Sequence, residues 1–377
     1  MESDLQIRTL PGDAGLREFV AAPWKILDVS AYPQWIPALR ISVRSTLDPK
    51  TNPFFRKSDR ALFLAEDGGR VVGRIAAIYN ASLAEVGRDP GFVGFFECVD
   101  RQDVAAALLG AAEEWLRARG CSRVQGPWSP SSNYEGGVLI RGFEHPQTFF
   151  TPWNPEYYAG LLEGAGYVKA KDLMAWHVRI ASMRRRFEEY ESLSNVIRAR
   201  AGLTLERVEV RNFERVMRDC WVVYQECWKD NWGFCPLPVE EWEYLAHELK
   251  PLIVPEGSLL VKAAGETIGF AVSLPDYNRA IMKDRSGRLF PLNWLRILRG
   301  RRRCEWARTL LAGVLPRFRR KGVLSVMLYE SLKNAALFGT EHVEASWILE
   351  DNVEMNAVLT QLEADPYRTW RVFERAI

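Results

Sequence analysis

The sequence predicts an α/β protein made of two halves, each a mixed, twisted sheet flanked by helices. Each half has a β-hairpin pattern followed by a strand, an amphipathic helix and a further strand, which requires a crossover connection and a partly parallel sheet. The 377 residues also exceed what one hydrophobic core usually supports. Because the order of elements repeats with almost no shared sequence, we interpret the chain as a tandem duplication. Its domains are expected at 1–180 and 203–377, joined by a linker helix at 181–202.

In the first half, strands and helices alternate between turn signals. The glycines of Asp67–Gly69 suit a hairpin turn, and Asp103–Arg119 repeats apolar residues at helical spacing before Gly120 ends the pattern. The expected elements are a strand at Leu5–Thr9, a helix at Gly15–Leu27, a hairpin at Ala61–Ala65 and Val71–Tyr79, a strand at Phe92–Val99, a helix at Asp103–Arg119, a strand at Val124–Gly126, a helix at Tyr157–Gly166 and a strand at Leu173–Ile180.

The second half repeats this order after a charged stretch, Ala181–Ala201, which is typical of a solvated helix between domains. Its expected elements are a strand at Leu203–Val210, helices at Phe213–Trp228 and Val239–Leu249, a hairpin at Gly257–Ala263 and Ile268–Ser273, a strand at Leu310–Leu315, a helix at Val323–Phe338, a strand at His342–Leu349, a helix at Met355–Leu362 and a strand at Thr369–Arg375.

An anion site is predicted where the strand Leu310–Leu315 leads into the helix that begins at Val323. Pro316 ends the strand, and a short basic turn with a glycine follows it. The first N–H groups of a helix have no partner within the helix, and the helix dipole favours negative charge. A phosphate or pyrophosphate is therefore the expected ligand.

Composition excludes several other classes of protein. The net charge of +2 gives no overall field for nucleic acid, and no apolar run is long enough to span a membrane. The six cysteines include no Cys-x-x-Cys pair and the four histidines lie far apart, so no metal site is expected. Met1–Asp4 lacks the layout of a signal peptide, so we expect a cytoplasmic protein, peripheral on the inner membrane face if it contacts lipid.

The segment Val314–Leu324 resembles the pyrophosphate loop of the GNAT superfamily of acyl-CoA N-acyltransferases. Arg319 and Gly322 match the loop pattern, whereas Leu324 stands where a small residue is usual, and Trp347–Asn352 resembles the next strand with its asparagine. The resemblance implies that acyl-CoA is the co-substrate, with no metal. It also implies a set of donor-binding residues: Val314, Arg319, Arg320, Lys321, Gly322, Val323, Leu324 and Asn352.

Two departures from the superfamily pattern carry information. Leu359 stands where many members place a tyrosine that protonates the thiolate, so we expect solvent or another group to serve that role here. The first half has the glycine-free Asp100–Asp103 in place of a phosphate loop. We therefore expect the first half to be degenerate and to serve the acceptor side.

The chain is also similar, over most of its length, to bacterial tandem GNAT-like proteins that include the bacterial ceramide synthases. The similarity is carried by Gly94–Cys98, Gly126–Glu135, Asn231–Phe234 and Ser346–Asn352. It implies acyl transfer from acyl-CoA, or from an acyl carrier protein, to a long-chain amine such as a sphingoid base. The alternatives are transfer to a small polar amine, amino acid or peptide, and a non-catalytic protein that binds acyl-CoA or lipid.

The candidate catalytic residues are Glu344, Glu97, Asn133, Glu135 and Ser346. Alternation along His342–Leu349 puts Glu344 and Ser346 on one face, and burial would raise the basicity of a carboxylate there. The alternative is a core ion pair between Glu344 and an arginine. For Glu97 the same two interpretations apply, a catalytic carboxylate or a structural role. Asn133 and Glu135 lie in an irregular loop, where they either orient the acceptor or only shape the turn.

The insertion Lys283–Arg303 interleaves leucines and a tryptophan with eight basic residues and one acid. This composition suits the headgroup region of an anionic membrane. A partner-docking helix, a nucleic-acid patch and a packed helix with an arginine-rich solvent side are the alternatives. We expect membrane-surface contact and no nucleic acid.

Overall fold

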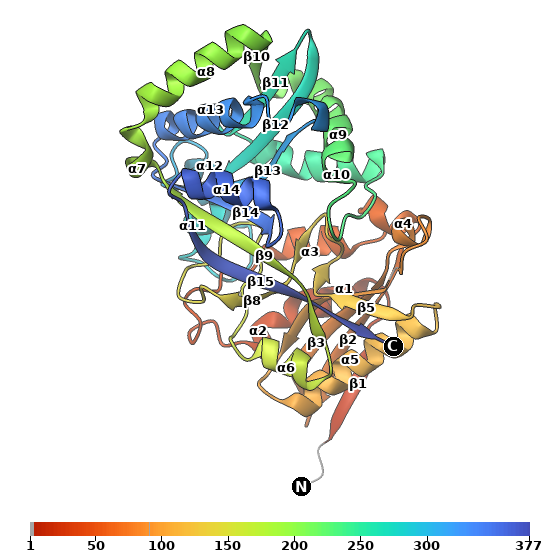
Figure 1. Cartoon of the computed structure of the whole chain (residues 1–377). Helices are drawn as coiled ribbons and strands as arrows, with labels where there is room; N and C mark the ends of the chain where they lie inside the picture. Colours follow the sequence, from red (N-terminus) through yellow and green to blue (C-terminus); the bar gives the residue numbers. More distant parts are fainter. Residues whose placement is uncertain (1–3, 90) are drawn as a thin grey trace. The chain divides into compact units, whose positions relative to one another are not determined.

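The computed structural model describes residues 4–89 and 91–377 (Figure 1). Residues 1–3, which contribute to the prediction of cellular location, lie outside this range. The chain divides into two compact units. The first unit contains Met1–Leu173, Met282–Asn293 and Arg368–Ile377, and the second contains Met174–Ile281 and Trp294–Tyr367. In the described part of the chain, no helix has the length and apolar character needed to cross a membrane.

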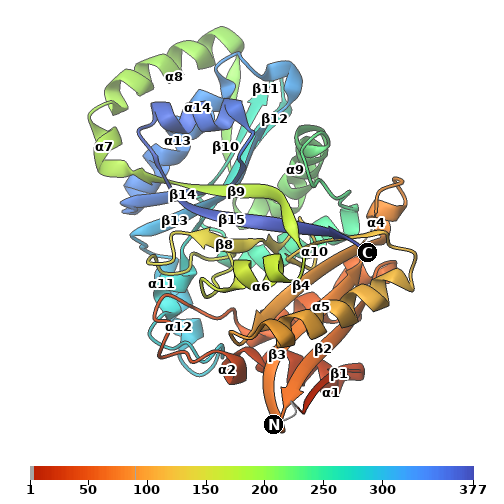
Figure 2. The ribbon, with the colours of Figure 1, turned by 60° about the horizontal axis from the view of Figure 1, so that its bottom comes forward.

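The first unit is a mixed sheet with helices packed against it, and its strands follow the order β1-β2-β3-β4-β5-β15-β9. Those strands are β1 (Leu5–Thr9), β2 (Asp59–Asp67), β3 (Arg70–Tyr79), β4 (Gly91–Cys98), β5 (Arg123–Gly126), β8 (Val138–Arg141), which pairs with β15, and parts of β9 (Val168–Arg179) and β15 (Asp365–Ala376). The long helix α5 (Gln102–Arg117) lies on β2 and β3 (Figure 2), where Val104 and Leu108 are fully buried in the core. β4 and β5 pair in parallel, as the crossover through α5 requires.

Shorter elements complete the first unit. They are α1 (Gly12–Ala21), α2 (Pro23–Ile26), α3 (Arg40–Leu47), α4 (Ala81–Ala84), α6 (Tyr158–Gly164) and a small two-stranded sheet of β6 (Trp128–Ser129) and β7 (Glu135–Gly136). The predicted helix Gly15–Leu27 is therefore two helices. The break falls at Ala22–Pro23, because proline has no N–H to donate and is favoured at the first position of a new helix.

The second unit repeats the arrangement, with strand order β15-β9-β14-β13-β12-β11-β10. Its strands are β10 (Leu203–Arg207), β11 (Ser258–Ala263), β12 (Glu266–Pro275), β13 (Trp306–Val314) and β14 (His342–Leu349), with β9 and β15 contributing residues to both units. Its helices are α7 (Ile180–Arg184), α8 (Phe187–Ala201), α9 (Phe213–Trp228), α10 (Val239–Leu249), α11 (Tyr277–Ile281), α12 (Asn293–Gly300), α13 (Val323–Phe338) and α14 (Val353–Gln361). β13 and β14 pair in parallel, whereas β10 with β11, β11 with β12, and β12 with β13 pair antiparallel.

Three features of the second unit differ from the sequence expectations. β13 begins at Trp306 rather than Leu310, so it includes the charged Arg308 that an apolar pattern does not identify. The charged helix α8 packs on α13, where Ser194 is buried and donates to Glu330 at 3.3 Å. The segment Met282–Asn293 belongs to the first unit. The contiguous domains 1–180 and 203–377 therefore remain a prediction. Each compact unit of the structure is built from segments that are not contiguous in the sequence.

Candidate active site

The predicted phosphate loop lies at the N-terminus of α13. The first helical N–H to bond within the helix is that of Val326, which donates to the Gly322 carbonyl at 3.0 Å, and no side chain caps the helix. Helix geometry leaves the preceding N–H groups directed outward for a ligand. Gly322 has a φ of +78°, and a Cβ added there would lie 2.7 Å from Cδ1 of Ile197. Glycine is required here for both the backbone conformation and the close approach of α8.

The basic side chains of this loop have different roles. The guanidinium of Arg319 donates to the carbonyls of Val314 and Cys227, each at 3.3 Å, so it fixes the loop to the end of β13 and to α9. Arg320 is exposed and pairs with Glu354 at 3.2 Å, and Lys321 is exposed as well. Both lie in the turn just before the α13 N-terminus, and their role in phosphate binding stays a prediction.

Two more of the predicted donor residues have identifiable structural contacts. Leu324 packs against the core cluster that contains Val323. Its size therefore serves core packing, which gives a physical reason for the departure from the loop pattern. Asn352 caps α14 by accepting from the Met355 N–H at 3.1 Å. Their roles in donor binding remain predictions.

The strand pair that precedes the loop opens toward it. β13 and β14 are in register only from Trp306–Thr309 against His342–Ala345. Among the residues that the structure describes, β13 has no paired neighbour on that side beyond this point, and its register with β12 shifts around Leu310. At about 3.3 Å per residue, the open edge extends about 16 Å from Thr309 to Val314. An extended chain can lie along this edge, with its anionic end at the α13 N-terminus.

At the closed end of the opening, polar side chains gather on one face of the sheet. Val343 of β14 packs with Leu332 of α13 and Leu359 of α14, so its neighbour Glu344 points to the opposite face. His177 points the same way, because its neighbours on β9 belong to that same cluster. We call the resulting group the polar platform; it consists of Trp306 and Arg308 on β13, His342 and Glu344 on β14, His177 on β9 and Tyr367 on β15.

Glu344 is fully buried and contacts side chains in this platform and beside it. Its Oε1 accepts from the Ser346 hydroxyl at 2.5 Å and lies 3.6 Å from Nε of Arg308, and its Oε2 accepts from the Tyr367 hydroxyl. Arg308 is 3% exposed and donates to Ser346 Oγ at 2.8 Å and to its carbonyl at 3.3 Å. The structure therefore brings Glu344 and Ser346 together, and it confirms the core ion pair that the sequence left open. A direct catalytic role for either residue stays a prediction.

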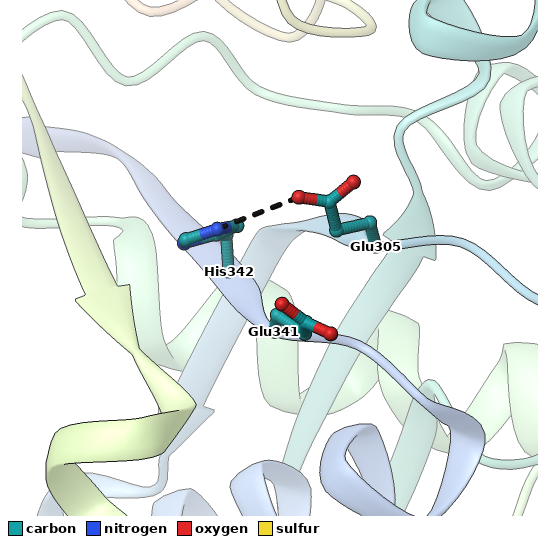
Figure 3. Close-up of side chains that lie close together, drawn as sticks. All are labelled: Glu305, Glu341 and His342. Atoms are coloured by element: carbon teal, nitrogen blue, oxygen red, sulfur yellow. Dashed lines mark ion pairs between the residues drawn. The ribbon is translucent and has the colours of Figure 1, made fainter.

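A second group continues the platform toward the surface. Nε2 of His177 and Nδ1 of His342 are 3.0 Å apart, and both rings stack on Trp306. Nε2 of His342 lies 3.6 Å from Oε1 of Glu305 (Figure 3). Glu341 completes a group whose ligand-type atoms lie within 4.8 Å of one another, with both glutamates exposed. We interpret this as a solvent-facing contact between carboxylates and an imidazole, and the expected absence of a metal stays a prediction.

The candidates of the first half all lie in the first unit. Glu97 on β4 pairs with Arg74, which is buried and also donates to the Phe19 carbonyl at 2.7 Å. The Asn133 N–H donates to Ser131 Oγ at 3.3 Å, and Glu135 pairs with Ser129 in the β6–β7 sheet. Glu97 thus forms an ion pair with a buried arginine, which is the structural role that was the alternative to catalysis. The loop of Asn133 and Glu135 is an ordered hairpin, and their catalytic roles remain predictions.

Sequence reasoning missed Arg308 and Tyr367. Tyr367 lies in the stretch between the predicted last helix and last strand, where no pattern identified it. Arg308 had a detectable signal, because a carboxylate expected inside a strand needs a buried cation as partner. A search for that cation just before the predicted strand Leu310–Leu315 would have found it.

Two proteins resemble the chain over its whole length. Protein YghO of Escherichia coli (strain K12) is 32% identical over 379 residues, covering 98% of this chain and 95% of that protein. The bacterial ceramide synthase of Caulobacter vibrioides (strain NA1000 / CB15N) is 31% identical over 392 residues, covering 100% of this chain and 98% of that protein. No protein-family model matches the chain.

Solved structures confirm the fold. A tandem GNAT protein from the clavulanic acid biosynthesis pathway superimposes with a TM-score of 0.58 at 14% identity, covering 99% of this chain and 98% of that chain. A GCN5-related N-acetyltransferase from Sphaerobacter thermophilus gives 0.53 at 13% identity, with coverage of 99% and 95%. The fold is thus the tandem GNAT fold expected from the sequence. The chain therefore belongs to the acyltransferase family that includes the bacterial ceramide synthase.

Proposed function

We propose that this acyltransferase moves a fatty acyl group from acyl-CoA to the primary amine of a long-chain base, such as a sphingoid base, and forms an amide. The products are an N-acylated long-chain base and free coenzyme A. The proposal that acyl-CoA is the donor is supported by the open edge of β13, which leads to the uncapped N-terminus of α13. One extended thioester donor fits this arrangement, with its pyrophosphate at the helix and its reacting carbon near the polar platform.

The proposal that the acceptor is a long-chain base rests on the relative named a bacterial ceramide synthase, which aligns with the whole chain. A long-chain base must come from a lipid surface, and α12 has suitable exposed side chains. Trp294 and Leu295 are each 37% exposed and Leu298 is 45% exposed. The arginines Arg299, Arg302 and Arg303 near them are exposed as well. We propose that α12 contacts an anionic membrane surface, where each basic residue contributes about 1 kcal/mol.

Vesicle co-sedimentation tests the membrane contact. We expect binding to vesicles rich in anionic lipid, little binding to neutral vesicles, and a fall in binding as salt rises. The variant Trp294→Ser/Leu298→Ser should lose this binding. Leu337→Ser on α13 is a matched control, because Leu337 is a leucine of the same unit that is 74% exposed. Equal binding by both variants would refute a role for α12.

The transfer reaction is tested with purified protein, acyl-CoA donors of increasing chain length and a panel of amines. The panel contains long-chain amino alcohols, amino acids, polyamines and short peptides. We expect thiol release together with an amide on the long-chain amino alcohols, identified by mass spectrometry. If amide forms only on small polar amines, the acceptor is a small polar amine and not a long-chain base. If the protein binds acyl-CoA but releases no thiol with any amine, it is a non-catalytic acyl-CoA-binding protein. A parallel arm with acyl carrier protein thioesters identifies the donor.

A further inference from the structure

Tyr367 occupies a distinctive place in the second unit. Its hydroxyl donates to Oε2 of Glu344, and its ring lies 5.6 Å from the ring of His177. Glu344 is opposite Arg308 in the parallel register, one residue before the pairing of β13 and β14 ends. Tyr367 is therefore anchored at the closed end of the opening that we assign to the donor.

Exposure separates Tyr367 from the groups that hold it. Glu344 is 0% exposed, and Arg308 and Ser346 are each 3% exposed, so a substrate cannot reach them without displacing other atoms. Tyr367 is partly exposed. In this cluster, the phenol is thus the group that can contact a bound molecule, and the buried carboxylate acts on that molecule only through the phenol.

The position at which many GNAT proteins carry a tyrosine holds a leucine in this chain. Leu359 of α14, which aligns with the tyrosine of many GNAT proteins, is 2% exposed and packs in the core with Val343 and Ile348. No proton donor or acceptor is present at that position. A phenol delivered from β15 can meet the need for proton transfer, and we choose it over the partly exposed imidazoles of His177 and His342 because its hydroxyl donates directly to the buried Glu344 carboxylate.

We propose that Tyr367 is a catalytic residue that shuttles a proton from the attacking amine to the departing thiolate, with Glu344 as the transient proton acceptor behind it. This inference rests on the proposed acyl transfer. As the neutral amine attacks the thioester carbon, the C–N bond forms and the amine nitrogen loses a proton to Oη of Tyr367, while the phenolic proton moves to Oε2 of Glu344. As the C–S bond breaks, Tyr367 gives a proton to the thiolate and recovers one from Glu344.

The balance of this sequence needs no further reactant. One proton moves from nitrogen to sulfur, and both side chains return to their starting states. Arg308 and Ser346 are positioning residues, because they hold the Glu344 carboxylate in place and touch no reacting atom. The two proton transfers through Tyr367 are concerted, so neither a free phenolate nor a neutral buried glutamic acid accumulates.

The test compares Tyr367→Phe with the wild type and with Tyr190→Phe, a tyrosine of α8 outside the platform. Rates are measured as thiol release and amide formation, and donor affinity is measured separately by acyl-CoA titration. We expect Tyr367→Phe to lower kcat by about 100-fold or more, the usual scale for a lost proton-transfer group, and to leave the acyl-CoA Kd unchanged. Tyr190→Phe should match the wild type.

A pH profile separates proton transfer from a purely structural role. The wild-type rate should level off once the amine is neutral, whereas the Tyr367→Phe rate should continue to rise, because hydroxide must then take the proton. Glu344→Gln keeps an acceptor for the phenol but cannot accept its proton, so it should lose rate as Tyr367→Phe does. The double variant should lose no more than either single variant.

Three results would overturn the proposal: a kcat within threefold of wild type for Tyr367→Phe, a loss that follows donor affinity, and pH profiles of the same shape. The proposed function fails separately. If the wild type acylates only small amines, the acceptor is wrong and the Tyr367 test runs unchanged on those amines. If the wild type releases no thiol with any amine, both proposals fall.

Discussion

The most direct prediction about stability concerns the buried pair of Arg308 and Glu344. We expect Arg308→Met to destabilise the second unit by about 3–5 kcal/mol, the usual cost of removing one partner of a buried ion pair. The lower end of that range is expected, because Ser346 and Tyr367 still donate to the Glu344 carboxylate. The loss arises from a charge left in a fully buried site rather than from the small change in side-chain volume.

Urea unfolding at neutral pH, monitored by tryptophan fluorescence and circular dichroism, measures this effect. Arg308→Met/Glu344→Gln removes the charge and keeps one acceptor oxygen, while its amide NH2 can donate to the oxygen of the second hydroxyl, so we expect it to recover most of the lost stability. Arg320→Met is the matched control, since its exposed pair with Glu354 should contribute less than about 1 kcal/mol. The reasoning is refuted if Arg308→Met unfolds within about 1 kcal/mol of wild type, or if the double variant is less stable than the single one.

Two further predictions test the phosphate loop and the Asp172 carboxylate. Gly322→Ala forces a left-handed residue and a contact with Ile197, so we expect a loss of about 1–2 kcal/mol in stability and weaker acyl-CoA binding by calorimetry. Gly339→Ala, at the other end of α13 with a φ of +87°, should lose stability without losing donor affinity; equal affinity losses would contradict the loop assignment. Burial raises the pKa of Asp172, but hydrogen bonds led by Arg371 outweigh it and hold that pKa below its usual value. A depressed pKa stabilises the folded state above the usual value near 4 and loses that effect as pH falls through the folded pKa. Asp172→Asn should therefore be less stable than wild type at pH 7, and this difference should narrow as pH falls below the usual value near 4 in acid titration; a constant gap at all pH values would exclude this linkage.

Elements with local signals were predictable from the sequence. The helix expected at Val323–Phe338 has those bounds in the structure, because glycines at both ends and a continuous apolar pattern define it. Both hairpins also appear where their turns predicted them, as β2–β3 and β11–β12. The topology follows, because a helix between strands that pair in parallel requires a right-handed crossover.

The site could be predicted only in part, because its contacts are non-local. The sequence identified Glu344 as a carboxylate inside a strand, but its partners come from β13 and β15, and no local pattern identifies them. The early start of β13 has the same cause, since Arg308 breaks an apolar run and is tolerated only with its buried partner. The exchange of Met282–Asn293 between the compact units likewise depends on tertiary packing that a contiguous sequence does not reveal.

The central claim, acyl transfer to a long-chain amine, is tested most directly by a competition experiment. The wild-type protein is given one long-chain acyl-CoA and an equimolar mixture of a long-chain amino alcohol, an amino acid and a polyamine, and the amides are quantified by mass spectrometry. The ratio of products reports the ratio of kcat/KM for the acceptors. Our account predicts that the amide of the long-chain amino alcohol dominates, with one thiol released for each amide. Dominance of an amide on a small polar amine would contradict the account.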